Sequence, residues 1–158
     1  MPKILTFKKI LALIVLFLPA CSAQSKLATI SGKITISSSL ASKIGPSDVI
    51  FVMAYSEETE SQPASIKSGS KVSNSPLPPL AVQKIMPPVF PAHYHLSKHD
   101  VIFPERRFEG PLQLRVRLDK DGNAKTIQPG DLEGVFKKNP VSVGSKNVDM
   151  VIDQEKQL

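Results

Sequence analysis

The sequence contains one cysteine, Cys21, and no tryptophan among its 158 residues. A single cysteine cannot form a disulfide within the chain, so the stability of the fold has to come from the burial of apolar side chains. The sequence also lacks the G-x-S-x-G and S-x-x-K serine motifs and any glycine-rich loop that could hold a phosphate. We therefore expect no catalytic residue, no enzymatic activity and no cofactor.

The chain also lacks an apolar run long enough to span a membrane. The longest run, Ile10–Leu18, has nine residues, and as a helix it would rise about 14 Å, roughly half of the hydrocarbon core of a bilayer. It follows three lysines and leads into Leu18-Pro19-Ala20-Cys21, which is the order found in a secretory signal peptide. Leu-Pro-Ala-Cys also resembles a bacterial lipobox, in which the cysteine is acylated through its thiol and becomes the first mature residue.

These features predict a lipoprotein signal peptide at residues 1–20 and a short polar tether at residues 21–27. Cys21 is then the attachment point of a lipid, and the membrane is a partner of the protein through that anchor. Ser22 follows instead of an aspartate, so similarity to lipoprotein sorting favours the outer over the inner membrane, in the bacterial periplasm. The alternative is an ordinary signal peptide in which Cys21 lies near the cleavage site by coincidence.

The excess of positive charge is small. The formal net charge of +6 falls to +3 without the three lysines of residues 1–20, a segment that contains no acidic residue. Such a charge does not indicate nucleic-acid binding, although a basic face would favour an acidic partner or anionic lipid. The remaining 138 residues suit a single domain with a core of its own.

Three segments have clear β-strand patterns. Residues 28–36 alternate apolar and polar side chains, with an expected bulge at Gly32. Residues 49–55, VIFVMAY, are apolar without alternation, which predicts a central strand that is covered on both faces and buries Phe51. Residues 112–118 alternate apolar and polar side chains, which predicts a strand with a basic outer face.

Shorter patterns complete the prediction. We expect one or two helical turns at 37–45 and a mobile serine-rich loop at 56–75, because that loop has too few large apolar side chains to offset the entropy of ordering it. A turn at Asp119–Gly122 would lead to a hairpin partner at 124–127. Further short strands are expected at 80–85, 94–97 and 148–152. Many short strands, little helix and 14 prolines favour an all-β fold, an antiparallel β-sandwich over residues 28–153.

Four motifs occur in an order that resembles a known family. They are ISGKITI at Ile30–Ile36, VIFVMAY at Val49–Tyr55, PPLAVQKI at Pro78–Ile85 and GNAKTIQPGDLEG at Gly122–Gly134. In this order they are similar to the C-terminal domain of cytochrome c biogenesis proteins of the CcmH/CycH type, which belong to the bacterial haem-ligation machinery. The matching residues are Pro79, Leu80, Ala81 and Val82 in one segment, and Gly122, Asn123, Ala124, Gln128, Pro129, Gly130, Asp131, Leu132, Glu133 and Gly134 in the other.

The resemblance implies an immunoglobulin-like β-sandwich with a binding or chaperone-like role in cytochrome c maturation. The implied partner is apocytochrome c or another haem-ligation component. The chain departs from the family at Leu96–Asp100, where LSKHD replaces an acidic LDD step, and the segment VIFPERRFEG that follows resembles an insertion. In the family this domain follows transmembrane helices and a helical-repeat region, whereas here it follows a lipobox. The resemblance thus describes a stand-alone sandwich domain tethered to a membrane.

The two longest matching motifs also have a purely structural interpretation. Pro129-Gly130 favours a turn, Asp131 can accept hydrogen bonds from nearby backbone amides, and Leu132 can fill the edge of the sandwich. In PPLAV the prolines would block an exposed edge strand, with Leu80 and Val82 packed inward.

The histidines offer an alternative function. His93, His95 and His99 are the only three and lie within seven residues. On a strand, His93 and His95 would project from the same face about 7 Å apart, a spacing suited to copper or zinc. A metal-binding periplasmic lipoprotein is therefore the alternative to the binding module, and solvated loop histidines without a ligand are the structural interpretation of the same cluster.

Two further clusters contain side chains that can bind a ligand. Asp119, Asp121 and Asn123 are spaced like part of a calcium loop, but Gly122 falls between the second and third of them, which breaks the EF-hand order and favours a hairpin turn. A basic patch for a peptide or lipid could form from four arginines, which are Arg106 and Arg107 near Phe108, with Arg115 and Arg117 on the outer strand face.

Overall fold

The computed structural model describes residues 28–56 and 78–157. The expected signal peptide at 1–20, Cys21, the tether at 21–27 and all of the expected 56–75 loop except Ser56 lie outside the described residues. Ser56 itself is the last residue of a strand. The described chain is almost entirely β-structure and contains only two short 3₁₀ turns. No helix in this part of the chain is long and apolar enough to cross a membrane.

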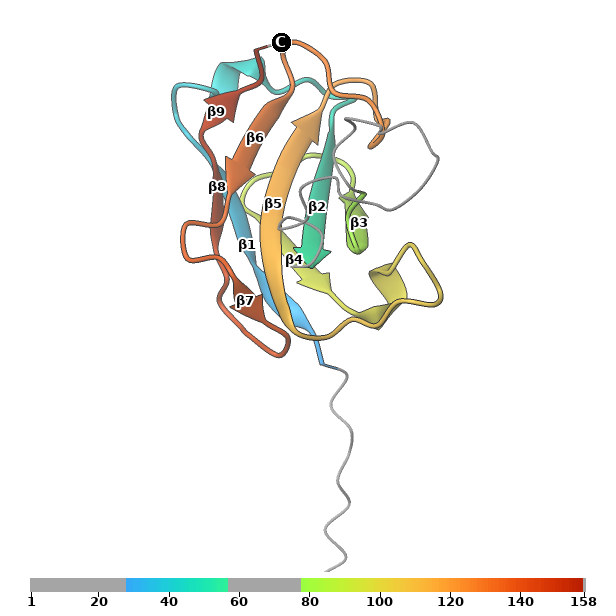
Figure 1. Ribbon diagram of the computed structural model, residues 1–158. Helices are drawn as coiled ribbons and strands as arrows, with labels where there is room; N and C mark the ends of the chain where they lie inside the picture. Colours follow the sequence, from blue (N-terminus) through green and yellow to red (C-terminus); the bar gives the residue numbers. More distant parts are fainter. Residues whose placement is uncertain (1–27, 57–77, 158) are drawn as a thin grey trace, which may run out of the picture.

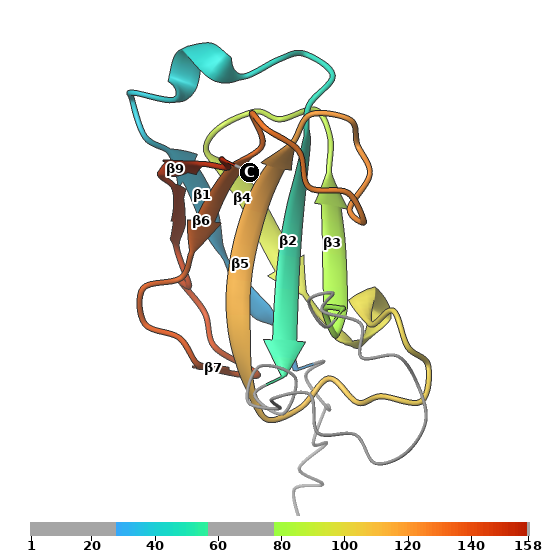
Figure 2. The ribbon, with the colours of Figure 1, turned by 45° about the horizontal axis from the view of Figure 1, so that its top comes forward.

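The strands form two sheets, one of three strands in the order β4-β1-β8 and one in the order β3-β2-β5-β6-β9, with β7 paired to β5 (Figures 1 and 2). The elements, in chain order, are β1 (Ile30–Ile36), η1 (Ala41–Lys43), β2 (Val49–Ser56), β3 (Ala81–Ile85), β4 (Ala92–Leu96), η2 (Lys98–Asp100), β5 (Pro111–Asp119), β6 (Leu132–Val135), β7 (Val141–Ser142), β8 (Met150–Ile152) and β9 (Gln154–Glu155). All pairings are antiparallel except that of β1 with β8, which is parallel.

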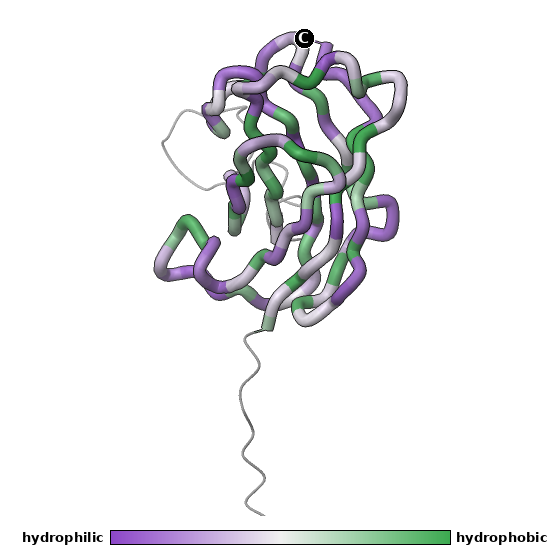
Figure 3. Tube along the Cα trace, turned by 180° about the vertical axis from the view of Figure 1, so that it is seen from behind, coloured by the Kyte–Doolittle hydropathy of each residue, from purple (hydrophilic) through white to green (hydrophobic). Residues whose placement is uncertain are grey.

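One apolar core lies between the two sheets. Ile30 and Ile34 of β1 and Leu96 of β4 enter it from one sheet, while Val52 of β2 and Leu114 of β5 enter it from the other. Figure 3 shows hydrophobic and hydrophilic positions interleaved along the strands. The burial of the apolar side chains in this core supplies the main stabilisation of the fold.

The central strand β2 is buried on both faces, as its unbroken apolar sequence predicts. Its other face carries a second, smaller cluster formed by Val49, Phe51 and Met53, against which Val82 of β3 packs. Phe51 is only 4% exposed. The prediction that Phe51 is a core residue is therefore confirmed.

The last strand segment changes sheets. β8 pairs with β1, whereas β9, only two residues further on, pairs with β6 of the other sheet. At the crossing point the Asp153 N–H donates to the Glu133 carbonyl (3.1 Å), and the Lys156 N–H donates to the Asp131 carbonyl (2.7 Å). The chain therefore joins the two sheets along one side of the core.

On the opposite side, the Gln83 side chain of β3 links the sheet edges. Its Oε1 accepts a hydrogen bond from the His95 N–H of β4 (3.0 Å). This satisfies a donor on the edge of the smaller sheet that would otherwise be open to another strand.

Gly32 is not a bulge, contrary to expectation. It pairs in regular register with Tyr94, and a Cβ at this position would overlap the Val148 carbonyl. Glycine is required because another backbone passes directly over it. Gly134 of β6 is in the same situation beneath the Val151 carbonyl of β8.

The predicted strand at 124–127 is wrong. The hairpin partner of β5 is β6, which pairs Leu132 with Leu118, and residues 120–131 form the connection. Ala124 lies in a turn inside that connection. The run Ala124–Ile127 does not pair because the carboxylates of Asp119 and Asp131, on either side of it, accept hydrogen bonds from backbone amides of the loop.

Other boundaries differ by a few residues. β4 begins at Ala92, two residues before the expected start, the expected helical segment at 37–45 is a single 3₁₀ turn, and β8 covers only the last three residues of 148–152. We call the end of the domain that holds residue 28 and the loop 101–110 the proximal end, and the end that holds residues 119–131 the distal end (Figure 1).

Candidate functional site

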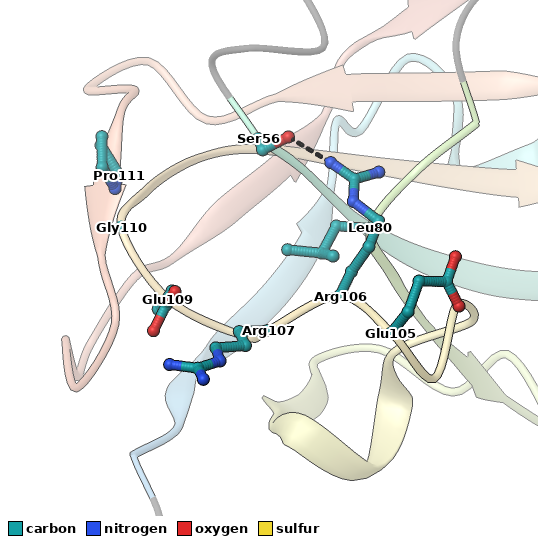
Figure 4. Close-up of a pocket in the computed structure, with 8 residues that line it drawn as sticks. All are labelled: Ser56, Leu80, Glu105, Arg106, Arg107, Glu109, Gly110 and Pro111. Carbon is teal, nitrogen blue, oxygen red and sulfur yellow. Dashed lines mark hydrogen bonds between the residues drawn. The ribbon is translucent and has the colours of Figure 1, made fainter.

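A pocket of about 530 Å³ opens at the proximal end. Its wall is the 101–110 loop between η2 and β5, and the end of β2 closes it on the other side (Figure 4). The lining residues are Ser56, Leu80, Glu105, Arg106, Arg107, Glu109, Gly110 and Pro111.

Arg106 is the side chain that crosses this pocket. Its Nη2 donates a hydrogen bond to the Ser56 Oγ (2.7 Å), and its guanidinium lies 6.0 Å from the centre of the Phe103 ring. Figure 4 shows Glu105 on one side of Arg106 and Arg107 with Glu109 on the other. Two guanidinium groups and two carboxylates leave the pocket with no net charge.

The pocket suits the binding of a polar group. A guanidinium fixed in position recognises carboxylate or phosphate oxygens. The Ser56 hydroxyl accepts a hydrogen bond from Arg106, which holds the guanidinium in place at the pocket.

The arginines that were expected to form one basic patch are not equivalent. Arg115 of β5 is exposed and its guanidinium stacks 5.3 Å from the centre of the Tyr55 ring. Arg117, two residues further along the same face, is only 5% exposed, which corrects the expectation that it lies on a solvated surface. Its Nη2 donates to the Ala124 carbonyl (2.9 Å) and lies 3.0 Å from Asp119 Oδ2.

The histidines do not gather into a metal site. His93 and His95 project from the exposed face of β4, as the strand pattern predicts. His99 lies in η2, and its backbone N–H donates to the Ser97 hydroxyl. No group of three histidine, cysteine or acidic side chains in the described part of the chain is arranged to hold a metal ion. The structure thus brings two of the three histidines onto one face and leaves the third elsewhere.

The segment PPLAVQKI, Pro78–Ile85, lies at the sheet edge. β3 is an edge strand, preceded by Pro79 and Leu80. Leu80 and Ala81 pack into the main core, but Val82 faces the second cluster on the opposite side of the sheet. The expectation that Leu80 and Val82 pack on the same side is wrong because the chain reaches the sheet only at Ala81.

The segment GNAKTIQPGDLEG, Gly122–Gly134, forms much of the distal end. Gly122 has a positive φ of 73° and Gly130 one of 93°, so both occupy the left-handed region that glycine tolerates. Leu132 and Gly134 belong to β6 rather than to a loop, and both are buried. Asn123, Ala124, Gln128 and Pro129 belong to the connection itself.

Asp131 holds this connection in place. Its carboxylate is fully buried; Oδ1 accepts the Lys120 N–H (3.0 Å) and Oδ2 accepts the Gln128 N–H (3.1 Å). These bonds tie the two ends of the loop together around a single charged group, which makes them stronger than neutral hydrogen bonds.

We expect Asp131→Asn to lower the free energy of unfolding by about 2–3 kcal/mol, because an amide NH₂ would replace one acceptor opposite a backbone donor. The measurement is urea denaturation followed by circular dichroism. Glu133→Gln is the control, since Glu133 forms a half-exposed ion pair with Lys156 and should change stability by less than about 1 kcal/mol. Equal effects of the two variants would contradict the structural role of Asp131.

Asp119 and Asp121 flank the same turn and have opposite pKa shifts. Burial raises the pKa of the Asp119 carboxyl above its ordinary value, and the adjacent Asp121 carboxyl adds to this effect. The Asn123 N–H lowers the pKa of Asp121, with help from the Thr126 hydroxyl. Both carboxylates accept the Asn123 N–H, at 3.0 and 2.9 Å, so these three residues form a turn.

No protein-family model, curated protein or solved structure matches this chain. Its function has to be argued from the chemistry of its own surface.

Sequence reasoning missed the buried hydroxyl of Tyr94. It donates to the Val148 carbonyl at 2.6 Å, and burial together with the charge of Asp149 raises its pKa. A tyrosine among the inward-facing residues of the strand AHYHL was the available signal, because a buried hydroxyl needs a partner.

Proposed function

We propose that the protein is a lipid-anchored, non-enzymatic binding module of the bacterial periplasm. In this proposal the domain is an immunoglobulin-like β-sandwich related to cytochrome c biogenesis proteins of the CcmH/CycH type. Its partner is an extended segment of apocytochrome c or of another haem-ligation component.

The observation that carries the proposal is the distance in sequence between the lipobox and the fold. Cys21 precedes residue 28 by only seven residues, which span at most about 25 Å when fully extended. An acylated Cys21 would therefore hold the proximal end, with its Arg106 pocket, close to the lipid headgroups. The sides and the distal end would remain accessible to partners in the periplasm.

The two-sheet architecture supports the finer assignment of the fold. Two mainly antiparallel sheets enclose one core, and β1 pairs with one strand in parallel and another in antiparallel orientation. Such sandwiches carry diverse binding functions, so the fold is compatible with the proposal and the partner has to be established by experiment.

The anchor is tested by Cys21→Ser. We expect the variant to appear in the soluble fraction or to accumulate unprocessed, because serine has no thiol to acylate. The measurement is membrane fractionation with detection of the protein in each fraction. Ser22→Ala should fractionate as the wild type does, and a Cys21→Ser protein that also does so would refute the anchor.

The partner is tested by isothermal titration of the full chain with unfolded apocytochrome c segments. We expect heat of binding at low ionic strength and an affinity that falls as salt is added, because the exposed cationic side chains contribute to recognition. The absence of heat at low ionic strength would refute this partner.

A further inference from the structure

Because the chain changes sheets at Asp153, half of β6 has no paired strand on the side away from β5. β9 pairs only with Leu132 and Glu133, and the residues that precede it, Met150–Ile152, form β8 of the other sheet. Figure 1 shows β9 beside the start of β6 and β8 leading into β9 from below. Among the described residues, no strand pairs with Val135 on the side away from β5.

The backbone of Val135 points toward this vacant position. The Phe136 N–H donates to the Leu114 carbonyl of β5 (3.1 Å), while the Glu133 carbonyl accepts from Asp153 on the other side. Backbone groups of successive residues in an antiparallel strand point to alternate sides. Val135 therefore has the orientation of Glu133, and its N–H and C=O face away from β5.

A groove of about 320 Å³ lies at this position. It runs between the end of β6 with its following turn and the segment that enters β8. Val135 and Val151 are 47% and 40% exposed, unusually high values for valines in strands of this domain. The lining residues are Val135, Phe136, Lys137, Lys138, Asn147, Asp149, Met150 and Val151.

The rim of the groove carries uncompensated positive charge. Lys137 and Lys138 are exposed and form no ion pair among the described residues. The acidic rim residue, Asp149, is already engaged, because its Oδ1 accepts the Lys33 N–H (3.0 Å) and its Oδ2 lies 3.5 Å from Lys33 Nζ. The free charge of the groove therefore comes from the two lysines.

We propose that this groove binds an extended acidic peptide segment of a partner protein. The segment adds a strand beside β6, forms backbone hydrogen bonds with Val135, places an apolar side chain on Val135 and Val151, and directs carboxylates to Lys137 and Lys138. Strand addition gives affinity through the main chain and specificity through alternate side chains. This inference rests on the proposed function as a binding module and adds the place and the chemistry of recognition.

The probe is a fluorescently labelled heptapeptide with alternating glutamate and valine, titrated against the full chain in detergent and followed by anisotropy. We expect K137E/K138E to weaken binding at least tenfold, since two attractive contacts become repulsive. The control K84E/K98E changes the net charge by the same amount, at exposed lysines outside the groove. It should alter the affinity less than twofold. Equal loss in both variants would show a non-specific charge effect and overturn the site.

The backbone contribution is tested without changing the protein. A heptapeptide with N-methylated valines keeps its charge but cannot donate those backbone hydrogen bonds, and it should bind at least tenfold more weakly. Unchanged affinity would overturn strand addition.

The outcomes separate this inference from the proposed function. If the glutamate-valine peptide does not bind the wild type, or binds K137E/K138E equally well, the groove site is wrong, while apocytochrome c titration and Cys21→Ser still decide the proposed function. If the peptide binds at the groove and apocytochrome c segments give no heat, the site is supported and the proposed partner is refuted.

Discussion

Replacing Phe51 by alanine should lower the free energy of unfolding by about 3–5 kcal/mol. Phe51 is 4% exposed and forms the centre of the second apolar cluster, between Val49 and Met53 and near Val82. Removing the ring from this cluster leaves a cavity on the outer face of β2, and the strand, held by two neighbours, cannot collapse to fill it.

The measurement is urea denaturation of the variant and the wild type under the same conditions. Phe51→Leu is the matched control, because it keeps most of the apolar volume and should cost less than about 1.5 kcal/mol. A change below about 1 kcal/mol in Phe51→Ala would mean that the second cluster contributes little to stability.

The second large effect is expected for Gly134→Ala, which should lower the free energy of unfolding by about 3 kcal/mol. A methyl group at this position overlaps the Val151 carbonyl of β8, so β6 and β8 would have to move apart. Because these strands belong to different sheets, the shift would disturb the packing of the main core.

Gly110→Ala separates this steric effect from the cost of the glycine conformation. Gly110 has a positive φ of 80° but nothing near its position for a Cβ to meet, so alanine there should cost only about 1–2 kcal/mol. If Gly134→Ala were no more destabilising than Gly110→Ala, the close approach of β6 to β8 would not be a constraint on the fold.

The long strands were predictable from local patterns alone. β1 and β5 alternate clearly, and β2 is apolar throughout, so their sequences specify which faces are buried. The patterns do not name the partners, and the structure pairs β2 with β5 in antiparallel orientation over Val49–Ser56. An all-β domain with mainly antiparallel sheets is therefore confirmed.

The distal connection was not predictable in the same way. Residues Ala124–Ile127 have β-forming side chains, whereas β6 contains a glycine and a glutamate, so propensity favours the wrong partner for β5. The deciding interactions are the hydrogen bonds of Asp119 and Asp131 to loop amides. These bonds join residues whose proximity depends on the finished fold.

The candidate sites show the same division. The arginines of the 101–110 loop could be identified from the sequence. Their pocket also requires Ser56 at the end of β2 and Leu80 just before β3. The alternating pattern of its strand predicts that Arg117 is exposed, but the connection formed by residues 120–131 covers its side chain. The groove beside Val135 depends on the sheet change at Asp153, for which no local pattern exists.

The central place of β1 in its sheet determines how the domain would withstand force. The described chain begins two residues before Ile30, and β1 is hydrogen-bonded to β4 on one side and β8 on the other. A load applied at residue 28 in the direction of β1 would shear the hydrogen bonds to β4 and to β8 together. β1 therefore cannot peel away one bond at a time, and the mechanical lifetime of a tethered complex would be limited by the rate of this cooperative rupture.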